Sequence, residues 1–419
     1  MQKSMFRLKT FVAFLFFSML VFGSTTLSAQ QPLPKMMLQT DDYIARREAA
    51  IVLVNEKKYA EALPLLEKLA AEKQADGQVF LGLGLAHWNL QNATKNKVEW
   101  KQTRLKARDA FLKASELGAS VPEIDLLTAS IKADGGDRND SDNPQAQAAL
   151  EEAFPLFAAR DYKKAVVAYE RAATLDPTHY EAALYTGNTY YALKDYDKAG
   201  IWFAKAIAID ANRETAHRYW GDGLMLSGKN KEAQDKFFDA IIAEPYNNAA
   251  WRGLGQFAGR NNIKLAHPKI EIPVNISSSE NGNTKLTLGM GDKDEDDGSI
   301  VWTAYGLNRA AWQTGKDGKR SDSFSKAYPN EKVYRHSLTE ETAALRTALT
   351  VLKESKTVKN LNPSVAALKK LNDEGLLEAY VLFARADAGI RRDYAAYRQS
   401  NRDKLKRYLT EYVIKNGGS

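Results

Sequence analysis

The sequence predicts a mostly α-helical protein in which a helix-turn-helix solenoid precedes a smaller α+β C-terminal region. Three observations predict it. Small, aromatic and small residues at spacings of four and three recur with a period of 34 residues. Glycines recur with the same period, at Gly187, Gly221 and Gly255. After Asn262 apolar and polar residues alternate, as in strands, and a helical pattern returns at Ser337.

The repeated positions explain how such a solenoid packs. Its three copies are Ala165/Tyr169/Ala172/Pro177, Ala199/Phe203/Ala206 and Ala233/Phe237/Ala240/Pro245. Small residues let two helices cross closely, and the aromatic residue fills the space between them. One helical pair cannot bury its apolar face alone, so neighbouring pairs must stack. The pattern resembles the tetratricopeptide repeat (TPR) family, which implies a scaffold that binds other proteins in a concave groove.

The N-terminus, residues 1–29, has the pattern of an export signal. Basic residues precede a 12-residue apolar run (11–22), and small residues up to Ala29 offer a cleavage site. The run is shorter than the roughly 20 residues that span a membrane, although an uncleaved anchor is the alternative. We therefore expect an exported protein, periplasmic or secreted, that is cleaved near Ala29. Cysteine is absent, which excludes disulfides and thiolate chemistry.

The rest of the chain divides by pattern. A leader precedes a degenerate TPR-like region, and a stretch of turn residues ending at Pro144 separates this region from the regular repeats. The expected segments are 30–40 (leader), 41–133 (degenerate TPR-like helices), 134–143 (linker), 144–262 (TPR array) and 263–419 (C-terminal region). The resemblance is most complete over 144–262, and the C-terminal region matches no family that we recognise. A fourth repeat begins near Trp251, and its second helix does not appear. We expect the C-terminal region to cap that end.

The TPR resemblance places several first-helix side chains in the groove. They are Asn188, Tyr191, Arg218, Asp222, Met225, Arg252, Gln256 and Arg260. This mixed surface suits an extended peptide or a helix. One TPR subtype grips a terminal carboxylate with a Lys and an Asn four residues apart, but the corresponding pairs here are Leu150/Phe154 and Leu184/Asn188. The lysine is missing, so that clamp is not expected.

The C-terminal region should begin with a small sheet and end in helices. The expected strands are 263–277, 284–289 and 299–304, and the expected helices lie near 338–356, 364–386 and 391–414. Residues 313–330 read as a loop. Ser337 and Glu340 form a capping box at the first of these helices. The last helix is rich in Arg, Lys and Tyr. It suits either packing against the protein with its charges in water or contact with an anionic surface.

No motif predicts chemistry. The acidic loop 292–297 fails the EF-hand pattern, because Asp297 stands where Gly is required and Thr303 where Glu is required. None of the five histidines has a paired metal spacing, and no phosphate loop or nucleophile elbow is present. We expect no cofactor, no metal and no enzyme activity. If the C-terminal region were catalytic, His267, His336 and the acidic loop would be the residues to suspect.

The leading hypothesis is an exported, non-catalytic scaffold that binds a protein or peptide partner in its groove. The alternative is an enzyme or glycan-binding protein whose active part lies in the C-terminal region and is positioned by the repeats. Peripheral association with the envelope through the basic C-terminal helix is a minor option. Removal of the export signal takes three positive charges and lowers the net charge from +7 to +4, a mild value that does not favour nucleic acid. The partner and the oligomeric state stay open.

Overall fold

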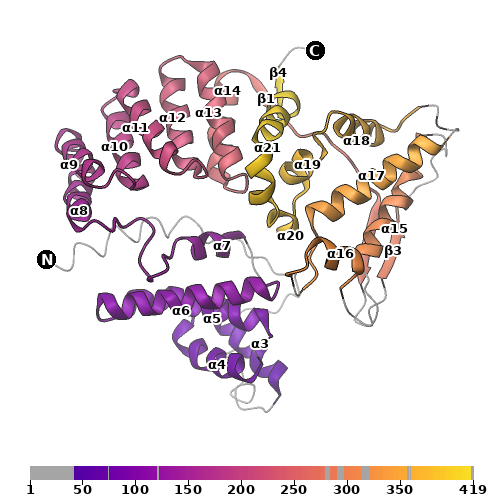
Figure 1. Ribbon diagram of the computed structural model, residues 1–419, viewed down its shortest axis with the longest axis horizontal. Helices are drawn as coiled ribbons and strands as arrows, with labels where there is room; N and C mark the ends of the chain where they lie inside the picture. The colour runs from indigo at the N-terminus through magenta and orange to yellow at the C-terminus, as the bar shows by residue number, and fades with distance from the viewer. Residues whose placement is uncertain are drawn as a thin grey trace. The chain divides into compact units, whose positions relative to one another are not determined.

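A computed structural model describes residues 42–73, 75–119, 122–278, 284–289, 297–313, 320–331, 333–355, 358 and 360–416. The expected export signal and leader lie outside this part of the chain. The chain divides into two compact units, 1–49 and 50–419. Helix α3 (Tyr43–Asn55) begins in the first unit, and every contact described below lies within the second. As predicted, the fold is mostly α-helical (Figure 1). None of the described helices is both long and apolar enough to span a membrane.

The N-terminal helices repeat the packing of the array with an interrupted spacing. They are α4 (Tyr59–Glu72), α5 (Gly77–Leu90), the 3-10 turn η1 (Gln91–Ala93), α6 (Lys97–Glu116) and α7 (Pro122–Ala129). A Cβ on Gly84 of α5 would lie 2.3 Å from Cδ1 of Phe111 on α6, so the helices cross at these two residues. The polar insert 91–101 forms η1 and the first turn of α6. The second helix of this pair is therefore displaced along the chain.

The segment 134–143, expected to be a linker, is fixed from both sides. The buried Arg104 of α6 donates hydrogen bonds to the carbonyl oxygens of Ser130 (3.0 Å) and Gly135 (3.1 Å). Its guanidinium also lies over the Trp88 and Trp100 rings, 5.1 and 4.5 Å from their centroids. On the other side, Asn143 caps the first helix of the array and donates to Leu175 O (2.8 Å). These bonds tie the segment to both neighbouring regions.

The regular array consists of antiparallel helices (Figure 1). They are α8 (Pro144–Ala158), α9 (Tyr162–Leu175), α10 (Tyr180–Ala192), α11 (Tyr196–Ile209), α12 (Glu214–Leu226), α13 (Asn230–Ala243) and α14 (Asn248–Arg260). The even-numbered helices are the first helices of their repeats. Asp161 and Asp195 cap α9 and α11 by accepting hydrogen bonds from backbone N–H groups in the first turn. Phe203 and Phe237 are fully buried between the helices, as the repeat pattern predicts.

A left-handed residue ends each first helix, and its position keeps the 34-residue period. The residues are Arg160, Lys194, Gly228 and Asn262, with φ between 54° and 74°. The turn of the fourth repeat is therefore formed. The chain leaves the repeat pattern only after this turn. Ile263 stands at the repeat position of the capping residues Asp161 and Asp195, and Pro268 would interrupt a second helix. A short strand follows in place of the second helix.

The C-terminal region contains two small antiparallel sheets and a set of helices. The strands are β1 (Ile263–Leu265), β2 (Val274–Ser278), β3 (Thr284–Leu288) and β4 (Ile414–Asn416). The helices are α15 (Val301–Gln313), α16 (Asp322–Ala327), α17 (Leu338–Glu354), α18 (Pro363–Asp373), α19 (Leu377–Tyr380), α20 (Ala388–Arg391) and α21 (Tyr394–Tyr408), with π-helical turns η4 (Val381–Arg385) and η5 (Leu409–Val413). β2 pairs with β3, with Val274 opposite Leu288, and β1 pairs with the distant β4, with Ile263 opposite Asn416.

Several local expectations for this region are wrong. Residues 299–304, expected as a strand, lead into α15, which packs on α17 and on the β2–β3 hairpin. The interval 313–330 contains α16. The helix expected at 364–386 breaks at Gly375, whose φ of 70° ends α18. The capping role of Ser337 is confirmed, since its hydroxyl accepts a hydrogen bond from Glu340 N at 3.2 Å.

The end of the array and the C-terminal region share one hydrophobic core. Phe237, Leu254 and Phe257 of the last repeats belong to the same buried cluster as residues of α17, α18 and α21. Tyr394 of α21 donates its hydroxyl to Ile242 O at 2.7 Å, across 152 residues of sequence. The C-terminal region therefore covers the apolar end of the array.

Candidate functional site

The eight side chains predicted for the groove lie on three first helices. We call this surface the first-helix face; it comprises Asn188 and Tyr191 on α10, Arg218, Asp222 and Met225 on α12, and Arg252, Gln256 and Arg260 on α14. The five on α10 and α12 are half-buried, whereas the three on α14 are exposed. None is fully buried. Exposure therefore increases toward the C-terminal end of the array, where no further first helix follows.

Arg218 occupies the centre of this face in a fixed position. Its Nε donates to Glu214 Oε2 at 2.7 Å, and its guanidinium lies 4.4 Å from the centroid of the Tyr219 ring. On the neighbouring helix, a Cβ on Gly253 would lie 3.1 Å from Cγ of Arg218. The absence of a side chain at this glycine gives the arginine stem its room. Glu214 is buried, so Arg218 chiefly neutralises the Glu214 carboxylate, which lies four residues earlier on the same helix.

Asp222 and Tyr191 connect the three helices electrostatically. Burial raises the pKa of the Asp222 carboxyl to about 6, while the positive charges of Arg218 and Arg260 partly oppose this rise. Burial also raises the pKa of the Tyr191 phenol, and the charge of Asp222 adds to it. The charge of Arg260 on α14 therefore acts on both Asp222 of α12 and Tyr191 of α10. These three predicted residues, from three helices, interact electrostatically.

The part of the face on α14 is open. The side chains of Arg252 and Arg260 form no hydrogen bond and no ion pair with another residue of the described chain. A Cβ on Gly255 or on Gly259 would meet nothing within 4 Å. Two guanidinium groups and exposed helix backbone therefore remain available to another molecule, although the charge of Arg260 also acts on Asp222.

The sequence reasoning missed two residues of this face. Leu226 of α12 is 44% exposed, and it precedes Arg260 by one repeat of 34 residues. Tyr219 supports the guanidinium of Arg218 and also lies 6.3 Å from the Tyr191 ring, centroid to centroid. The repeat period could have identified Leu226 once Arg260 was selected. The role of Tyr219 depends on the cation–π contact, which the period does not reveal.

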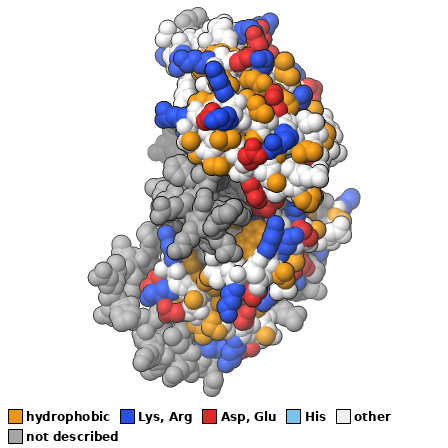
Figure 2. Space-filling model, turned by 90° about the vertical axis from the view of Figure 1, so that its left-hand side faces the viewer, with side chains coloured by type: hydrophobic (Ala, Val, Ile, Leu, Met, Phe, Trp, Pro, Cys, Tyr) orange, Lys and Arg blue, Asp and Glu red, His pale blue; other side chains and the backbone are white. Residues whose placement is uncertain are grey.

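A different surface carries a mixture of side chains without one dominant charge. On the side where α8 and α9 lie, basic and acidic side chains of the described residues alternate with hydrophobic ones (Figure 2). Val167 of α9 and Ile201 of α11, one repeat apart, are 61% and 58% exposed. They lie on second helices and therefore not on the first-helix face.

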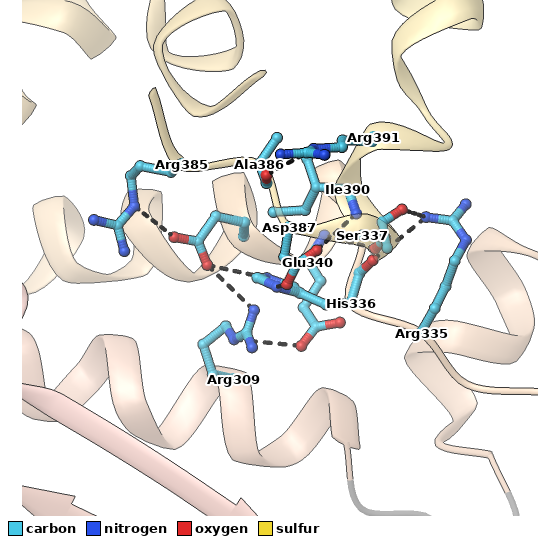
Figure 3. Close-up of polar contacts among 12 residues, drawn as sticks. Arg309, Arg335, His336, Ser337, Glu340, Arg385, Ala386, Asp387, Ile390 and Arg391 are labelled. Carbon is cyan, nitrogen blue, oxygen red and sulfur yellow. Dashed lines mark hydrogen bonds and ion pairs between the residues drawn. The ribbon is translucent and has the colours of Figure 1, made fainter. Parts of the chain in front are cut away.

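The C-terminal region contains a dense polar network around His336 (Figure 3). The His336 Nδ1 atom lies 2.6 Å from Asp387 Oδ2, and Nε2 lies 3.2 Å from Glu341 Oε2. The same Glu341 accepts hydrogen bonds from Arg309 (3.2 Å) and Arg385 (3.3 Å). Both ring nitrogens and the carboxylate of Glu341 are thus engaged. The network joins α17 to α15 and to the segment before α20, and this geometry favours a structural role.

The buried Glu340 extends this network. It forms an ion pair with Arg309 (3.4 Å) and accepts the Tyr334 hydroxyl (2.8 Å). Burial raises the pKa of Glu340, against the pull of the Arg309 charge. Of the acidic loop 292–297, only Asp297 is described, and its carboxylate accepts a hydrogen bond from Ser299 N at 2.8 Å. Among the described residues, no group of three or more His, Asp or Glu side chains could hold a metal ion.

His267 and the basic helix α21 are engaged at the contact with the array. His267 Nδ1 lies 2.8 Å from the Tyr408 hydroxyl, and burial lowers the pKa of this imidazole. Arg398 donates to Ala243 O, and Lys406 pairs with Asp235 at 3.2 Å. The buried residues of α21 point inward, as expected of a packed helix. We expected a packed helix to keep its charges in water. Instead, Arg398 and Lys406 of α21 contact the array.

Comparison with known proteins identifies the repeats. The tetratricopeptide repeat family model matches residues 156–219. No curated protein matches the chain. Solved structures with similarity include the first TPR of Spaghetti (RPAP3) bound to the HSP90 peptide SRMEEVD, at 21% identity over 29% of this chain and 96% of that one, with a TM-score of 0.28. The Arabidopsis OM64 TPR domain has 20% identity over 29% of this chain and 99% of that domain, with a TM-score of 0.27. YrrB, a TPR protein with an unusual peptide-binding site, has 17% identity over 53% of this chain and 96% of that one, with a TM-score of 0.24.

Proposed function

Because residues 156–219 are tetratricopeptide repeats, we propose that this chain is an exported, non-catalytic scaffold that binds a protein partner on its first-helix face. In solenoids of this kind, the first helices line the concave side. The observation that carries the proposal is the open face of α14, where Arg252, Gln256 and Arg260 are exposed and a Cβ on Gly255 or Gly259 would meet nothing within 4 Å.

The chemistry of the face suits a segment with acidic groups. Arg252 and Arg260 are exposed and form no ion pair in the described chain, whereas Arg218 is already paired with Glu214. Charge-assisted hydrogen bonds from guanidinium to carboxylate are among the stronger polar contacts. Tyr191 and Leu226 add apolar surface beside these charges. The partner would therefore contribute carboxylates toward α14 and apolar side chains toward α10 and α12.

The test is affinity capture from a cell-envelope extract. The bait is the mature chain, compared with the double variant Arg252→Ala/Arg260→Ala. The matched control, Lys163→Ala/Lys231→Ala, removes two exposed charges from second helices. We expect a prey that the control retains and the arginine variant loses. A prey retained equally by both variants would show that the first-helix face is not the binding site.

Export is the second part of the proposal. Its support is the basic start, the apolar run 11–22 and the small residues before Gln30. Mass spectrometry of the protein from fractionated cells should find a mature N-terminus near Gln30 outside the cytoplasm. An intact N-terminus in the cytoplasmic fraction would refute export without affecting the proposed binding face.

A further inference from the structure

Gly255 stands at a repeat position whose usual neighbour is missing. One and two repeats earlier, Gly221 and Gly187 are buried against an aromatic residue of the following second helix. A Cβ on Gly187 would lie 2.6 Å from Phe203, and one on Gly221 would lie 3.0 Å from Phe237. At Gly255 nothing lies within 4 Å, and the residue is exposed.

None of the described residues fills this position. The turn at Asn262 keeps the left-handed geometry of the other repeats, but β1 then leads away to pair with β4. The C-terminal region covers Trp251 at the start of α14, where its ring contacts Phe383 (6.2 Å between centroids). In the second half of α14, Phe257 and Ala258 are buried, whereas Gly255, Gln256, Gly259 and Arg260 are exposed.

We propose that a helix from a protein partner packs an aromatic side chain on Gly255, in the place that Phe203 and Phe237 occupy in the preceding repeats. This inference rests on the proposed function, because Arg252 and Arg260 of the first-helix face lie on the same helix, three residues before and five residues after Gly255. It specifies that the bound segment is helical and which residue anchors it.

The preceding repeats and the charges of α14 define the chemistry of this helix. The second helices α11 and α13 present their aromatic residue four after one alanine and three before another, as in Ala233, Phe237 and Ala240. Small residues around the aromatic one let the two helices cross closely. Acidic residues on the rim of the partner helix would pair with Arg252 and Arg260, whose side chains form no ion pair in the described chain.

A peptide taken from the chain itself supplies the probe. Residues 229–246 contain α13, and a lactam between two solvent-facing positions keeps the peptide helical, as verified by circular dichroism. Fluorescence anisotropy then measures its binding to the full mature chain. We expect saturable binding that weakens at least about tenfold when the peptide carries Phe237→Ala, because buried aromatic anchors dominate such contacts.

Two protein variants localise the binding. Gly255→Leu places a side chain in the open space and should weaken the peptide at least about tenfold. Ala148→Leu makes a comparable change at an exposed position of the first helix α8 and should leave the affinity unchanged. If the helical peptide fails to bind, or if Gly255→Leu binds it as tightly as the unmodified chain does, the inference is overturned.

The outcomes separate this inference from the proposed function. A prey captured from the envelope that is lost with Arg252→Ala/Arg260→Ala but retained by Gly255→Leu would support the scaffold and refute the helix. Peptide binding that depends on Gly255, without any prey that depends on the first-helix face, would support the helix position and refute the proposed function. A dimer of the chain that Gly255→Leu dissociates would assign the position to a second copy and overturn the partner helix.

Discussion

Three glycines at one repeat position provide a graded test of the packing. Each lies at the same depth of a 13-residue first helix, and their surroundings differ. The added Cβ of Gly187→Ala would lie 2.6 Å from the Phe203 ring, and that of Gly221→Ala would lie 3.0 Å from Phe237. The Cβ of Gly255→Ala would meet nothing within 4 Å. The three substitutions therefore make the same chemical change, and the steric clash of the added Cβ decreases from Gly187 to Gly221 to Gly255.

The expected magnitudes result from two opposing effects. Replacing a mid-helix glycine by alanine stabilises a helix by ~1 kcal/mol, and this gain is common to all three variants. Forcing extra atoms into a well-packed core costs ~1–3 kcal/mol. Gly255→Ala should therefore raise the free energy of unfolding by up to ~1 kcal/mol. Gly187→Ala should lower it by as much as ~2 kcal/mol, and Gly221→Ala should fall between them.

Urea-induced unfolding of the mature chain, followed by circular dichroism and by tyrosine and tryptophan fluorescence, measures these differences. The difference between Gly187→Ala and Gly255→Ala isolates the steric cost, because the helix propensity cancels. If Gly255→Ala destabilised the chain as much as Gly187→Ala does, another segment would have to cover α14 in solution. That result would refute both the packing argument and the open position at Gly255.

Three further predictions concern other parts of the chain. Asp222→Asn should stabilise the fold by roughly 1 kcal/mol at pH 7.5 and have no effect at pH 3.5. Because the folded chain raises the pKa of Asp222, the protonated carboxyl favours folding at low pH, and this contribution is lost as the pH rises through about 6. An equal effect of Asp222→Asn at both pH values in urea titrations would contradict this prediction. Arg104→Met should leave the buried carbonyl of Gly135 unpaired, at ~1–3 kcal/mol, whereas Ser130 O keeps its hydrogen bond from Arg138 N. The variant should also speed amide exchange over residues 130–137. Lys101→Ala, which removes only an exposed ion pair with Asp134, is the control, and unchanged exchange in the Arg104 variant would count against the anchoring role. Deleting residues 263–419 should expose the apolar end of the array and cause aggregation in size-exclusion chromatography, whereas a monomeric array of undiminished stability would refute the capping role.

The sequence predicts the array well because its packing is local. Phe203 and Phe237 meet glycines 16 residues earlier in their own repeats, so a period in the sequence is also a period in space. The same reasoning places the eight side chains of the first-helix face on three helices. It does not predict their unequal exposure, because that exposure depends on the course of the chain after α14.

The C-terminal region is less predictable because distant contacts decide its structure. Val301, Trp302 and Tyr305 have high strand propensity, yet they are buried on a helix between α17 and the β2–β3 hairpin. β4 pairs with a strand about 150 residues earlier, which no local pattern indicates. The network of His336 likewise joins residues from three separate segments. Its carboxylates at Glu341 and Asp387 stand out only when the chain is folded.

The common core at the end of the array restricts how this protein can change in evolution. An ordinary solenoid gains or loses repeats at either end, because each repeat contacts only its neighbours. Here Phe237, Leu254 and Phe257 are shared with helices of the C-terminal region, so a repeat inserted after α14 would separate two halves of one core. A repeat inserted before α8 would break hydrogen bonds of segment 134–143, such as that from Asn143 to Leu175 O, and would leave this core intact. The array can therefore lengthen in one direction only, and the surface on α14 keeps a constant distance from the C-terminal region.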